Sequence, residues 1–184
     1  MAISNLPMTT QKRYVAHYYL AVCLAAAQRA GHSAAALLAA AGLPQSWALE
    51  GAAPARLTPM ELTQLIQGLW ALTDDEFMGL GTAPCRRGTF ALMIEFAARA
   101  DTLGGFLRRC ARFYSVLQPQ LTVALVPTGS DDEDWMFRLH LDHRGRDREH
   151  LLQEFLLLLV QRSASWLVGQ PLPYSRTSFD YPQP

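Results

Sequence analysis

The sequence predicts an α+β fold, in which N-terminal helices precede a small antiparallel sheet with helices packed on one face. Three observations lead to this prediction. The first half of the chain contains segments whose apolar residues recur at helical spacing. Two later segments, residues 121–126 and 135–142, have the apolar patterns of strands. A long apolar helix, residues 148–168, follows them, and a two-stranded hairpin needs such a helix to cover its apolar face.

The first two predicted helices are separated by glycine. Residues 10–30 place apolar side chains on one stripe, and Gly31 stops the helix. Ser33 can cap a second, alanine-rich helix that ends at Gly42, just before Pro44.

The third predicted helix has a complete start signal. Thr58 is the N-cap, Pro59 takes the first helical position, and Glu61 closes a capping box. The helix is expected to run to about Thr73. The glycine- and proline-rich residues 78–88 that follow are expected to form a loop.

Two helices, residues 89–100 and 103–117, are predicted on either side of a tight turn. On a helical wheel of the second helix, apolar residues fill one arc, while Arg108 and Arg112 lie opposite and Arg109 lies at the margin. Residues opposite a core face are usually solvated, so we expect these arginines not to line a pocket.

Two glycines open the second of these helices, where glycine costs about 1 kcal/mol relative to alanine. Gly104 and Gly105 therefore indicate a local requirement. Either the two helices approach closely there, or an anion binds at the N–H groups of the helix start.

The strand pair is predicted to be a hairpin. Residues 121–126 and 135–142 flank an acidic turn, and the second segment alternates apolar and polar residues with period 2. Asp147 can cap the helix at residues 148–168. Residues 176–181 are a candidate third strand.

The bulk composition limits the classes of function. The chain has 184 residues, half of them hydrophobic, which suits a single domain over residues 1–184. Basic and acidic residues number 16 each, whereas a free-standing nucleic-acid binder usually has a basic excess. No signal peptide is evident. The most hydrophobic segment of the chain has its longest uninterrupted apolar run at residues 155–160, which is too short to span a bilayer. We expect a soluble, cytoplasmic protein without membrane contact.

No metal site, cofactor or catalytic residue is predicted. The three cysteines are scattered and lack the spacing of zinc ligands. His140, Asp142 and His143 are close in sequence, but no further ligand is predictable. Glu95 and Glu154 are single carboxylates without a predictable mate, and no nucleophile motif is present. Residues 33–50 imitate a helix-turn-helix, but their second half has no basic or amide-rich surface.

The candidate ligand site is apolar. Aromatic and methionine side chains between a sheet and its helices form either a packed core or the wall of a pocket for a small, partly apolar ligand. One arginine on the opposite strand face is a candidate polar anchor. The candidate residues are Phe90, Met93, Phe96, Phe113, Trp135, Phe137 and Arg138.

Three segments within residues 79–114, GLGTAP, GTFALM and TLGGFLRRCARFY, carry a family resemblance. The chain resembles the N-terminal effector-binding (arabinose-binding-like) domain of AraC-type bacterial transcription regulators. The upstream segments ALLAAAGLP and LTPMELTQLIQGLWALTDDEFMGL fit, as do the strand pair, long helix and FDYPQP downstream, so the resemblance covers nearly all the chain. Its strongest positions are Gly88, Phe90, Thr102, Leu103, Gly104, Arg112 and Phe113.

The resemblance implies a function without chemistry. A complete regulator of that family carries a C-terminal pair of helix-turn-helix units, which nothing in this chain matches, so the chain is expected to be the sensory part of a longer protein. It would bind a small-molecule effector, form a homodimer, and reach DNA only through the missing C-terminal domain. Two alternatives stay open: a pure dimerisation module with a solid core, and an enzyme whose site is not visible in the sequence.

Overall fold

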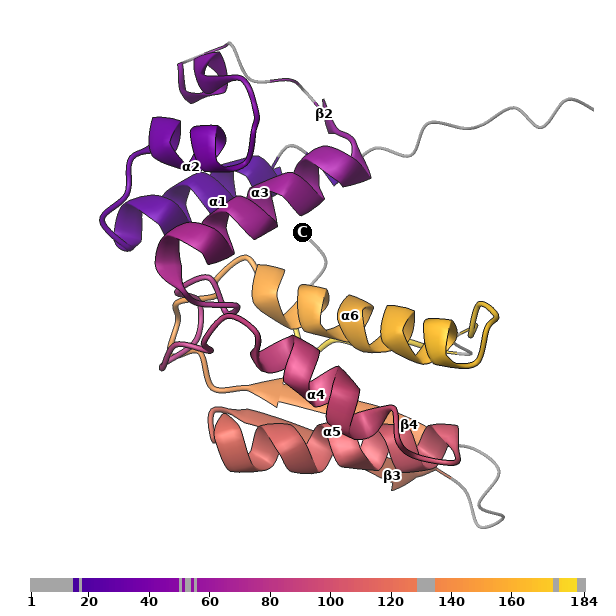
Figure 1. Ribbon diagram of the computed structural model, residues 1–184. Coiled ribbons are helices and arrows are strands. Elements are labelled where there is room, and N and C mark those ends of the chain that lie inside the picture. The colour runs from indigo at the N-terminus through magenta and orange to yellow at the C-terminus, as the bar shows by residue number, and fades with distance from the viewer. Residues whose placement is uncertain are drawn as a thin grey trace, which may run out of the picture. The chain divides into compact units, whose positions relative to one another are not determined.

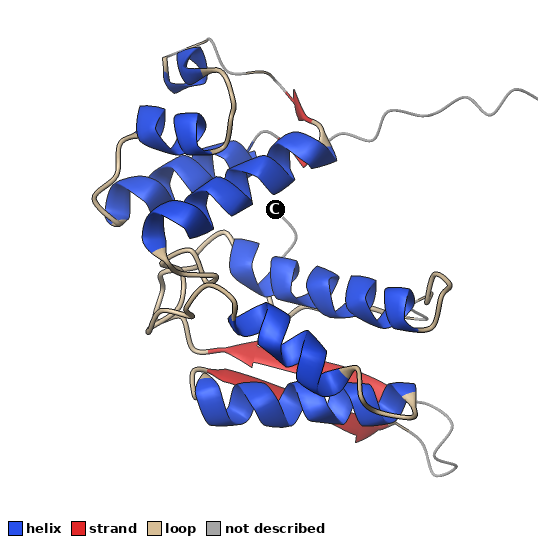
Figure 2. Ribbon diagram, viewed as in Figure 1, coloured by secondary structure: helices blue, strands red, loops and turns tan. Residues whose placement is uncertain are grey.

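The structure is a computed structural model, and it describes residues 15–16, 18–49, 51, 54, 56–128, 135–173 and 176–181. Within them lie six α-helices, one short 3-10 helix and two antiparallel strand pairs, which confirms the predicted α+β class (Figure 2). Contacts cluster into two compact units, Met1–Gly79 and Leu80–Pro184, and each is described by itself. That residues 1–184 behave as a single domain remains a prediction.

The first unit is mainly helical. Helix α3 packs against α1 and α2, and a two-residue strand pair accompanies them. The elements in chain order are β1 (Val15–Ala16), α1 (Tyr18–Arg29), α2 (Ala34–Ala40), the 3-10 helix η1 (Gln45–Ala48), β2 (Arg56–Leu57) and α3 (Pro59–Thr73).

The start of α1 differs from the prediction. Instead of a helix from residue 10, residues 15–16 form strand β1, which pairs antiparallel with β2, and α1 begins at Tyr18. Residues 10–14 lie outside the described part of the chain. The prediction failed because the partner strand is about 40 residues away, at Arg56–Leu57, and helical periodicity carries no information about that pairing.

The predicted helix starts in this unit are confirmed. The Ser33 Oγ accepts a hydrogen bond of 3.1 Å from the Ala36 N–H. In the capping box, the Glu61 N–H donates to Thr58 Oγ1 (3.2 Å), and the Thr58 N–H donates to Glu61 Oε2 (2.7 Å). Helix α3 ends at Thr73, as predicted. These bonds occupy amide groups that a helix start otherwise leaves unpaired.

Helices α2 and α3 approach closely at Gly68. A β-carbon at Gly68 would lie 2.9 Å from the Ala41 backbone nitrogen and 3.0 Å from its α-carbon. Gly68 thus allows the contact that buries Leu38 and Leu65 completely.

The second unit packs three helices with a hairpin (Figure 1). Helix α5 lies along strand β3, α6 contacts β4, and α4 lies between α5 and α6. The strands pair antiparallel from Leu121↔Leu141 to Pro127↔Trp135, as the sequence predicts. The elements are α4 (Thr89–Ala97), α5 (Leu103–Leu117), β3 (Leu121–Pro127), β4 (Trp135–Leu141) and α6 (Leu151–Leu167).

Three predictions are corrected in this unit. Helix α4 ends at Ala97 rather than residue 100. Helix α6 begins at Leu151 rather than residue 148. Residues 176–181 form no strand and instead contact α6 through Tyr181. The apolar pattern of these residues fits a strand, but it does not identify the partner. In the structure that partner is helix α6 and not the edge of a sheet.

Asp147 caps α6 from farther away than expected. Its two carboxylate oxygens accept from the Leu152 N–H (3.2 Å) and the Gln153 N–H (3.1 Å), across an intervening turn with His150 at φ 56°. The carboxylate is fully buried. Burial raises its pKa above 3.8, opposed in part by the two amide bonds and by the nearby His143 and His150.

Gln120 fixes the loop that leads into α4. Its Oε1 accepts from Thr82 Oγ1 (2.8 Å) and the Ala83 N–H (2.9 Å), and its Nε2 donates to the Ala83 carbonyl (2.7 Å). A single buried amide therefore ties the loop to the start of β3.

Gly68→Ala is expected to destabilise the first unit by about 1–3 kcal/mol, because α2 and α3 must separate to admit the methyl group. Gly104→Ala is the control, since its β-carbon would meet only the flexible Arg108 side chain at 3.4 Å. That substitution should be neutral or stabilise by up to about 1 kcal/mol. Urea denaturation followed by circular dichroism measures both, and equal effects would refute the close contact at Gly68.

Asp147→Ala is expected to destabilise the second unit by about 2 kcal/mol, because two buried amide groups lose their acceptors. Ser33→Ala removes an exposed cap instead and should cost about 1 kcal/mol or less. Hydrogen exchange of the first turn of α6 gives the local readout. Unchanged protection of the Leu152 and Gln153 amides in Asp147→Ala would contradict this role.

Candidate functional site

One hollow in the second unit is lined by residues from α4, α5, β3, β4 and α6. Its cavity volume is about 10 Å³, room for about one water molecule. The walls are apolar throughout. The lining residues are Phe90 and Met93 of α4, Cys110 and Tyr114 of α5, Leu121 and Val123 of β3, Phe137 and Leu139 of β4, and Leu156, Leu159 and Val160 of α6.

The alternation of the hairpin decides which strand residues reach the hollow. Val123 and Leu139 are directly paired across the two strands, and both line it. Their neighbours Thr122, Arg138 and His140 belong to the opposite face and are exposed. The predicted apolar and polar strand faces are therefore found in the structure.

Three of the seven candidate residues line the hollow, namely Phe90, Met93 and Phe137. Phe96 and Phe113 pair with each other between α4 and α5, with ring centroids 6.2 Å apart. The Arg109 guanidinium lies 5.6 Å from the Phe96 ring and donates to the Phe96 carbonyl (3.2 Å). Phe96 and Phe113 thus lie beside the hollow, where they hold α4 against α5.

The other two candidates lie apart from the hollow. Trp135, at the start of β4, is 44% exposed, and the Arg108 guanidinium lies 5.8 Å from its ring centroid. Arg138 is exposed on the far strand face, where it donates to the Met136 sulfur at 3.9 Å. Arg108 and Arg112 are exposed, as predicted for the face of α5 opposite its core.

The sequence did not single out most of the lining residues. Cys110 and Tyr114 belong to the apolar arc that was visible on the wheel of α5, so that signal was available. Leu156, Leu159 and Val160 could not be chosen, because the run FLLLLV is apolar on every side of α6. Only packing against β4 and α5 selects the face that points inward.

Two titratable side chains, Cys110 and Tyr114, line the hollow. Cys110, 1% exposed, is its only thiol, and burial raises the pKa of that thiol to about 12. The thiol therefore stays protonated near neutral pH and is a poor nucleophile. No charged side chain lines the hollow.

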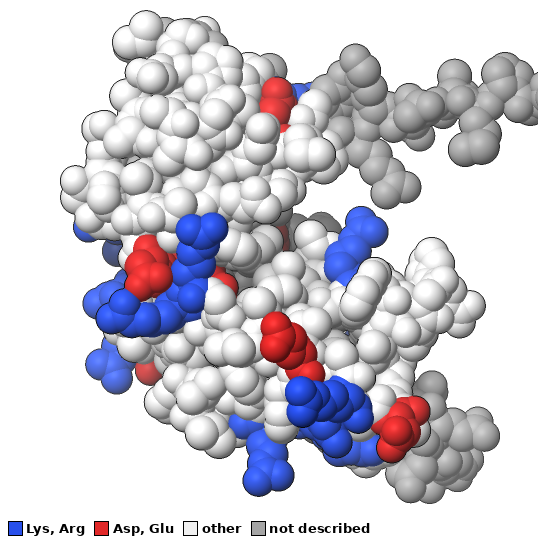
Figure 3. All heavy atoms as spheres, in the orientation of Figure 1, with Lys and Arg blue, Asp and Glu red and all other residues white. Residues whose placement is uncertain are grey.

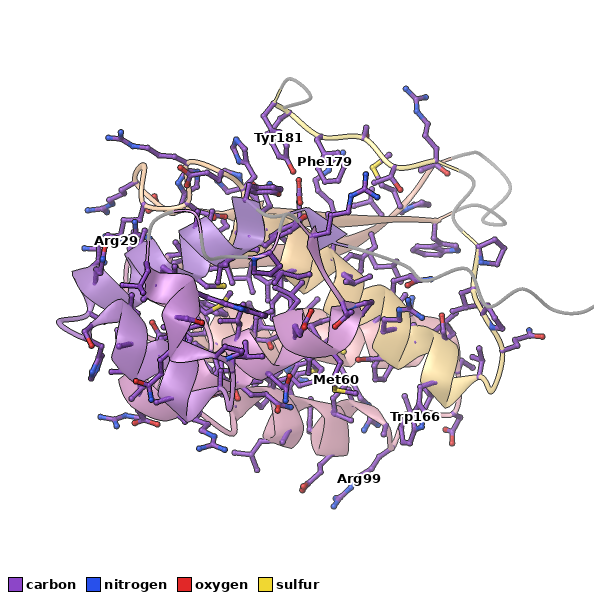
Figure 4. All side chains as sticks on the ribbon, turned by 90° about the horizontal axis from the view of Figure 1, so that it is seen from above. Arg29, Met60, Arg99, Trp166, Phe179 and Tyr181 are labelled. Carbon is purple, nitrogen blue, oxygen red and sulfur yellow. The ribbon has the colours of Figure 1, made fainter. Side chains whose placement is uncertain are left out.

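Polar groups gather elsewhere, at the start of α6. The ring of His150 stacks on that of Tyr181 at 3.6 Å with an interplanar angle of 1°, and Tyr181 donates to Glu154 Oε1 (3.1 Å). Tyr181 also contacts Phe179, next to it in Figure 4, with ring centroids 5.0 Å apart. The ring of His143 meets that of His150 edge-on at 6.2 Å.

The contacts of this polar cluster are structural. Asp147 already accepts two amide hydrogens, and His143 Nδ1 accepts from the Gly145 and Asp147 N–H groups at 3.2 and 3.3 Å. Buried His150 Nδ1 has no hydrogen-bond partner among the described residues. The cluster thus fastens the C-terminal segment to α6.

Other kinds of site find no support in the described part of the chain. No three His, Cys, Asp or Glu side chains gather there as metal ligands, and Asp142 contacts Arg144 instead (3.4 Å). None of the described helices is both long and apolar enough to cross a membrane. On the face shown in Figure 3, basic and acidic side chains are interspersed, without a broad basic patch.

Cys110 is expected to make stability fall at alkaline pH. Its pKa is 9.0 for an ordinary thiol and about 12 in the fold, so above pH 9 the unfolded chain loses a proton that the folded chain keeps. Stability therefore falls between pH 9 and 12, by about 1.4 kcal/mol between pH 8 and pH 10 for this thiol.

Cys110→Ala should accordingly lose about 1.4 kcal/mol less than the parent chain between pH 8 and pH 10, whatever the substitution costs at pH 7. Urea denaturation at the two pH values measures the difference. Cys23→Ala is the parallel case in the first unit, where burial also raises a thiol pKa to about 12, and it should reduce the alkaline loss of that unit in the same way. A Cys110→Ala variant with the parent's full alkaline loss would show that this thiol ionises in the fold.

Comparison with known proteins gives one match. The sequence pattern of the arabinose-binding domain of AraC transcription regulators, N-terminal part, matches residues 31–184. No curated protein and no solved structure matches the chain. The family match begins within the first unit and runs through the whole of the second, including every residue that lines the hollow. The chain therefore belongs to the family of N-terminal arabinose-binding domains of AraC transcription regulators.

Proposed function

We propose that this chain senses a small-molecule effector in the hollow of its second unit and thereby modulates DNA binding by a C-terminal domain that follows it in a longer bacterial, cytoplasmic regulator. The observation that carries the proposal is the hollow itself: five elements spread over residues 90–160 converge on it in a chain of a ligand-sensing family. Phe90, Met93 and Phe137 are the proposed contact residues.

Entry of a ligand requires one wall to move, because the cavity has room for about one water molecule. Of the three helices that line the hollow, α4 has the fewest buried residues. Only Met93 and Ala97 of its nine residues are fully buried, whereas Leu92 is 60% and Phe96 is 42% exposed. Elements with few buried contacts open at the lowest free-energy cost. Displacement of α4 is thus the proposed opening step.

Helix α6 offers a route from the hollow to the end of the chain. Its residues Leu156, Leu159 and Val160 form one wall. The following segment runs back along the same helix. Gln161 Nε2 donates to the Leu172 carbonyl (3.0 Å), and the Leu172 N–H donates to Ser165 Oγ (3.1 Å).

The far end of that segment is held at Glu154 and His150 through Tyr181. A ligand that binds more tightly to one position of α6 would therefore also favour one position of the segment that leads onward. Such differential affinity is the thermodynamic requirement for a regulatory effect. This coupling is part of the proposal.

Two observations favour the alternative of a dimerisation module with a solid core. The cavity is only water-sized, and large apolar side chains are exposed on the second unit, among them Leu158 (51%) and Trp166 (74%). A homodimer would cover such side chains, and it is also compatible with sensing. The enzyme alternative is opposed by the lack of titratable side chains, other than Cys110 and Tyr114, around the hollow.

The proposal predicts that an effector stabilises the second unit. At a hundredfold excess over its dissociation constant, a ligand that binds only the folded chain adds about 2.7 kcal/mol, which raises the melting temperature by several degrees. A thermal-shift screen of bacterial metabolites, with hits checked by calorimetry, measures this effect. A hit that is consumed during the measurement would support the enzyme instead.

Two neighbouring strand residues provide the controls. Phe137→Ala, in the hollow wall, should weaken binding at least tenfold, whereas Met136→Ala, on the opposite strand face, should leave it unchanged. Both variants must first show a cooperative melting transition. A folded Phe137→Ala variant with unchanged affinity would refute the hollow as the site, and no hit with any metabolite would favour the solid dimerisation module.

A further inference from the structure

We propose that the effector enters the hollow as hydrocarbon, by an alkyl chain or an unsubstituted ring, and not by a sugar or a charged group. This inference rests on the proposed function, because it names the ligand class of the same site. It follows from the chemistry of the walls rather than from the name of the family.

The walls provide almost nothing to which a polar ligand can bond. Nine of the eleven lining side chains have no oxygen, nitrogen or thiol group, and the surface that faces the hollow is apolar. The exceptions are the Tyr114 hydroxyl and the Cys110 thiol, both on α5. A pentose carries a hydroxyl on most of its carbons, so most of its hydroxyls would be buried there without partners. Burial of an unpaired hydroxyl is unfavourable, so arabinose is a poor occupant.

A carboxylate or an ammonium group is excluded more strongly. Helix α5 carries arginines that could pair a carboxylate, but Arg108 contacts Trp135 and Arg109 contacts Phe96, both outside the hollow wall. Arg138 lies on the far face of the hairpin. A charged group taken into the hollow would therefore be buried without a counter-charge. A free amino acid is thus disfavoured as well.

Hydrocarbon suits the same walls. Met93 is unbranched and can adapt its shape to a ligand. The lining is fully buried at Cys110 and Leu121 but half-buried at Leu139 and Val160, so an apolar surface continues from the interior towards solvent. An alkyl chain that follows this surface removes apolar area from water on both partners, while its polar end stays outside.

A series of straight-chain alcohols tests the inference on the 184-residue chain. Alcohols from butanol to octanol have a constant polar end, so any change in affinity reports the added hydrocarbon. Calorimetry is expected to show binding that tightens about fourfold per methylene group, the fold-change equivalent to about 0.8 kcal/mol. Arabinose and leucine, tested at the same concentrations, should show no binding.

The location of the bound alcohol is read from Cys110. Peptide mass spectrometry over a prolonged exposure to a thiol reagent, which reaches this buried thiol only when the unit opens, should show slower modification of Cys110 when octanol is bound. Cys23, fully buried in the first unit, is the internal control and should not change. Val160→Phe, which fills the hollow from α6, should weaken octanol binding at least tenfold. Leu158→Phe, on the same helix but 51% exposed, should not.

The outcomes separate this inference from the proposed function. Arabinose or leucine binding with Cys110 protection, and none from alcohols, overturns the ligand class but leaves sensing in place. Absence of binding by every probe and every screened metabolite overturns both. Chain-length dependence without Cys110 protection places the alcohol elsewhere and overturns this inference alone. Should Val160→Phe fail to fold, the alcohol series and Cys110 protection on the parent chain decide.

Discussion

A two-stranded hairpin leaves both of its faces open, and the second unit is organised by the need to cover one of them. In β3 and β4 the residues with odd numbers form the apolar face, which packs against α5 and α6. Neither strand has a second partner among the described residues, so side-chain burial, rather than a broad hydrogen-bonded sheet, holds the hairpin in place. Helix α4 then closes the remaining side. The hollow is the space at the centre of this arrangement, and its apolar walls are a direct result of it.

Buried polar groups fix the positions of the helices around that apolar centre. Asp147 holds the first turn of α6, and Gln120 holds the loop before α4, each with hydrogen bonds to backbone groups. Both side chains are buried, and such bonds matter because unpaired buried amides are costly. Because these groups lie at the ends of helices, they restrict the ends and leave the middle of the unit to side-chain packing. The two kinds of interaction are separated in space: polar contacts at the loops, hydrocarbon at the centre.

This separation of polar and apolar contacts affects which class of ligand the second unit can accept. Membership in the arabinose-binding family of AraC regulators describes a sensory domain, but the family name does not describe the wall chemistry found here. The candidate site could be predicted in part from the sequence. Phe90, Met93 and Phe137 lie on apolar faces that the helical and strand periodicity of the sequence identifies. Phe96, Phe113 and Trp135 lie on the same faces by period, yet packing leaves them beside or outside the hollow.

Local chemistry determined the caps at Ser33 and Thr58, the two faces of β4 and the exposed arginines of α5, because each depends on residues within one or two turns of the chain. Tertiary structure alone decided the pairing of β1 with β2, the inward face of α6, and the return of Tyr181 to His150 and Glu154. The strand pairing and the Tyr181 contacts join residues that are distant in sequence. The inward face of α6 is one of several faces that are equally apolar in sequence. Periodicity has no signal for either, since it records what one segment can bury and not which partner buries it.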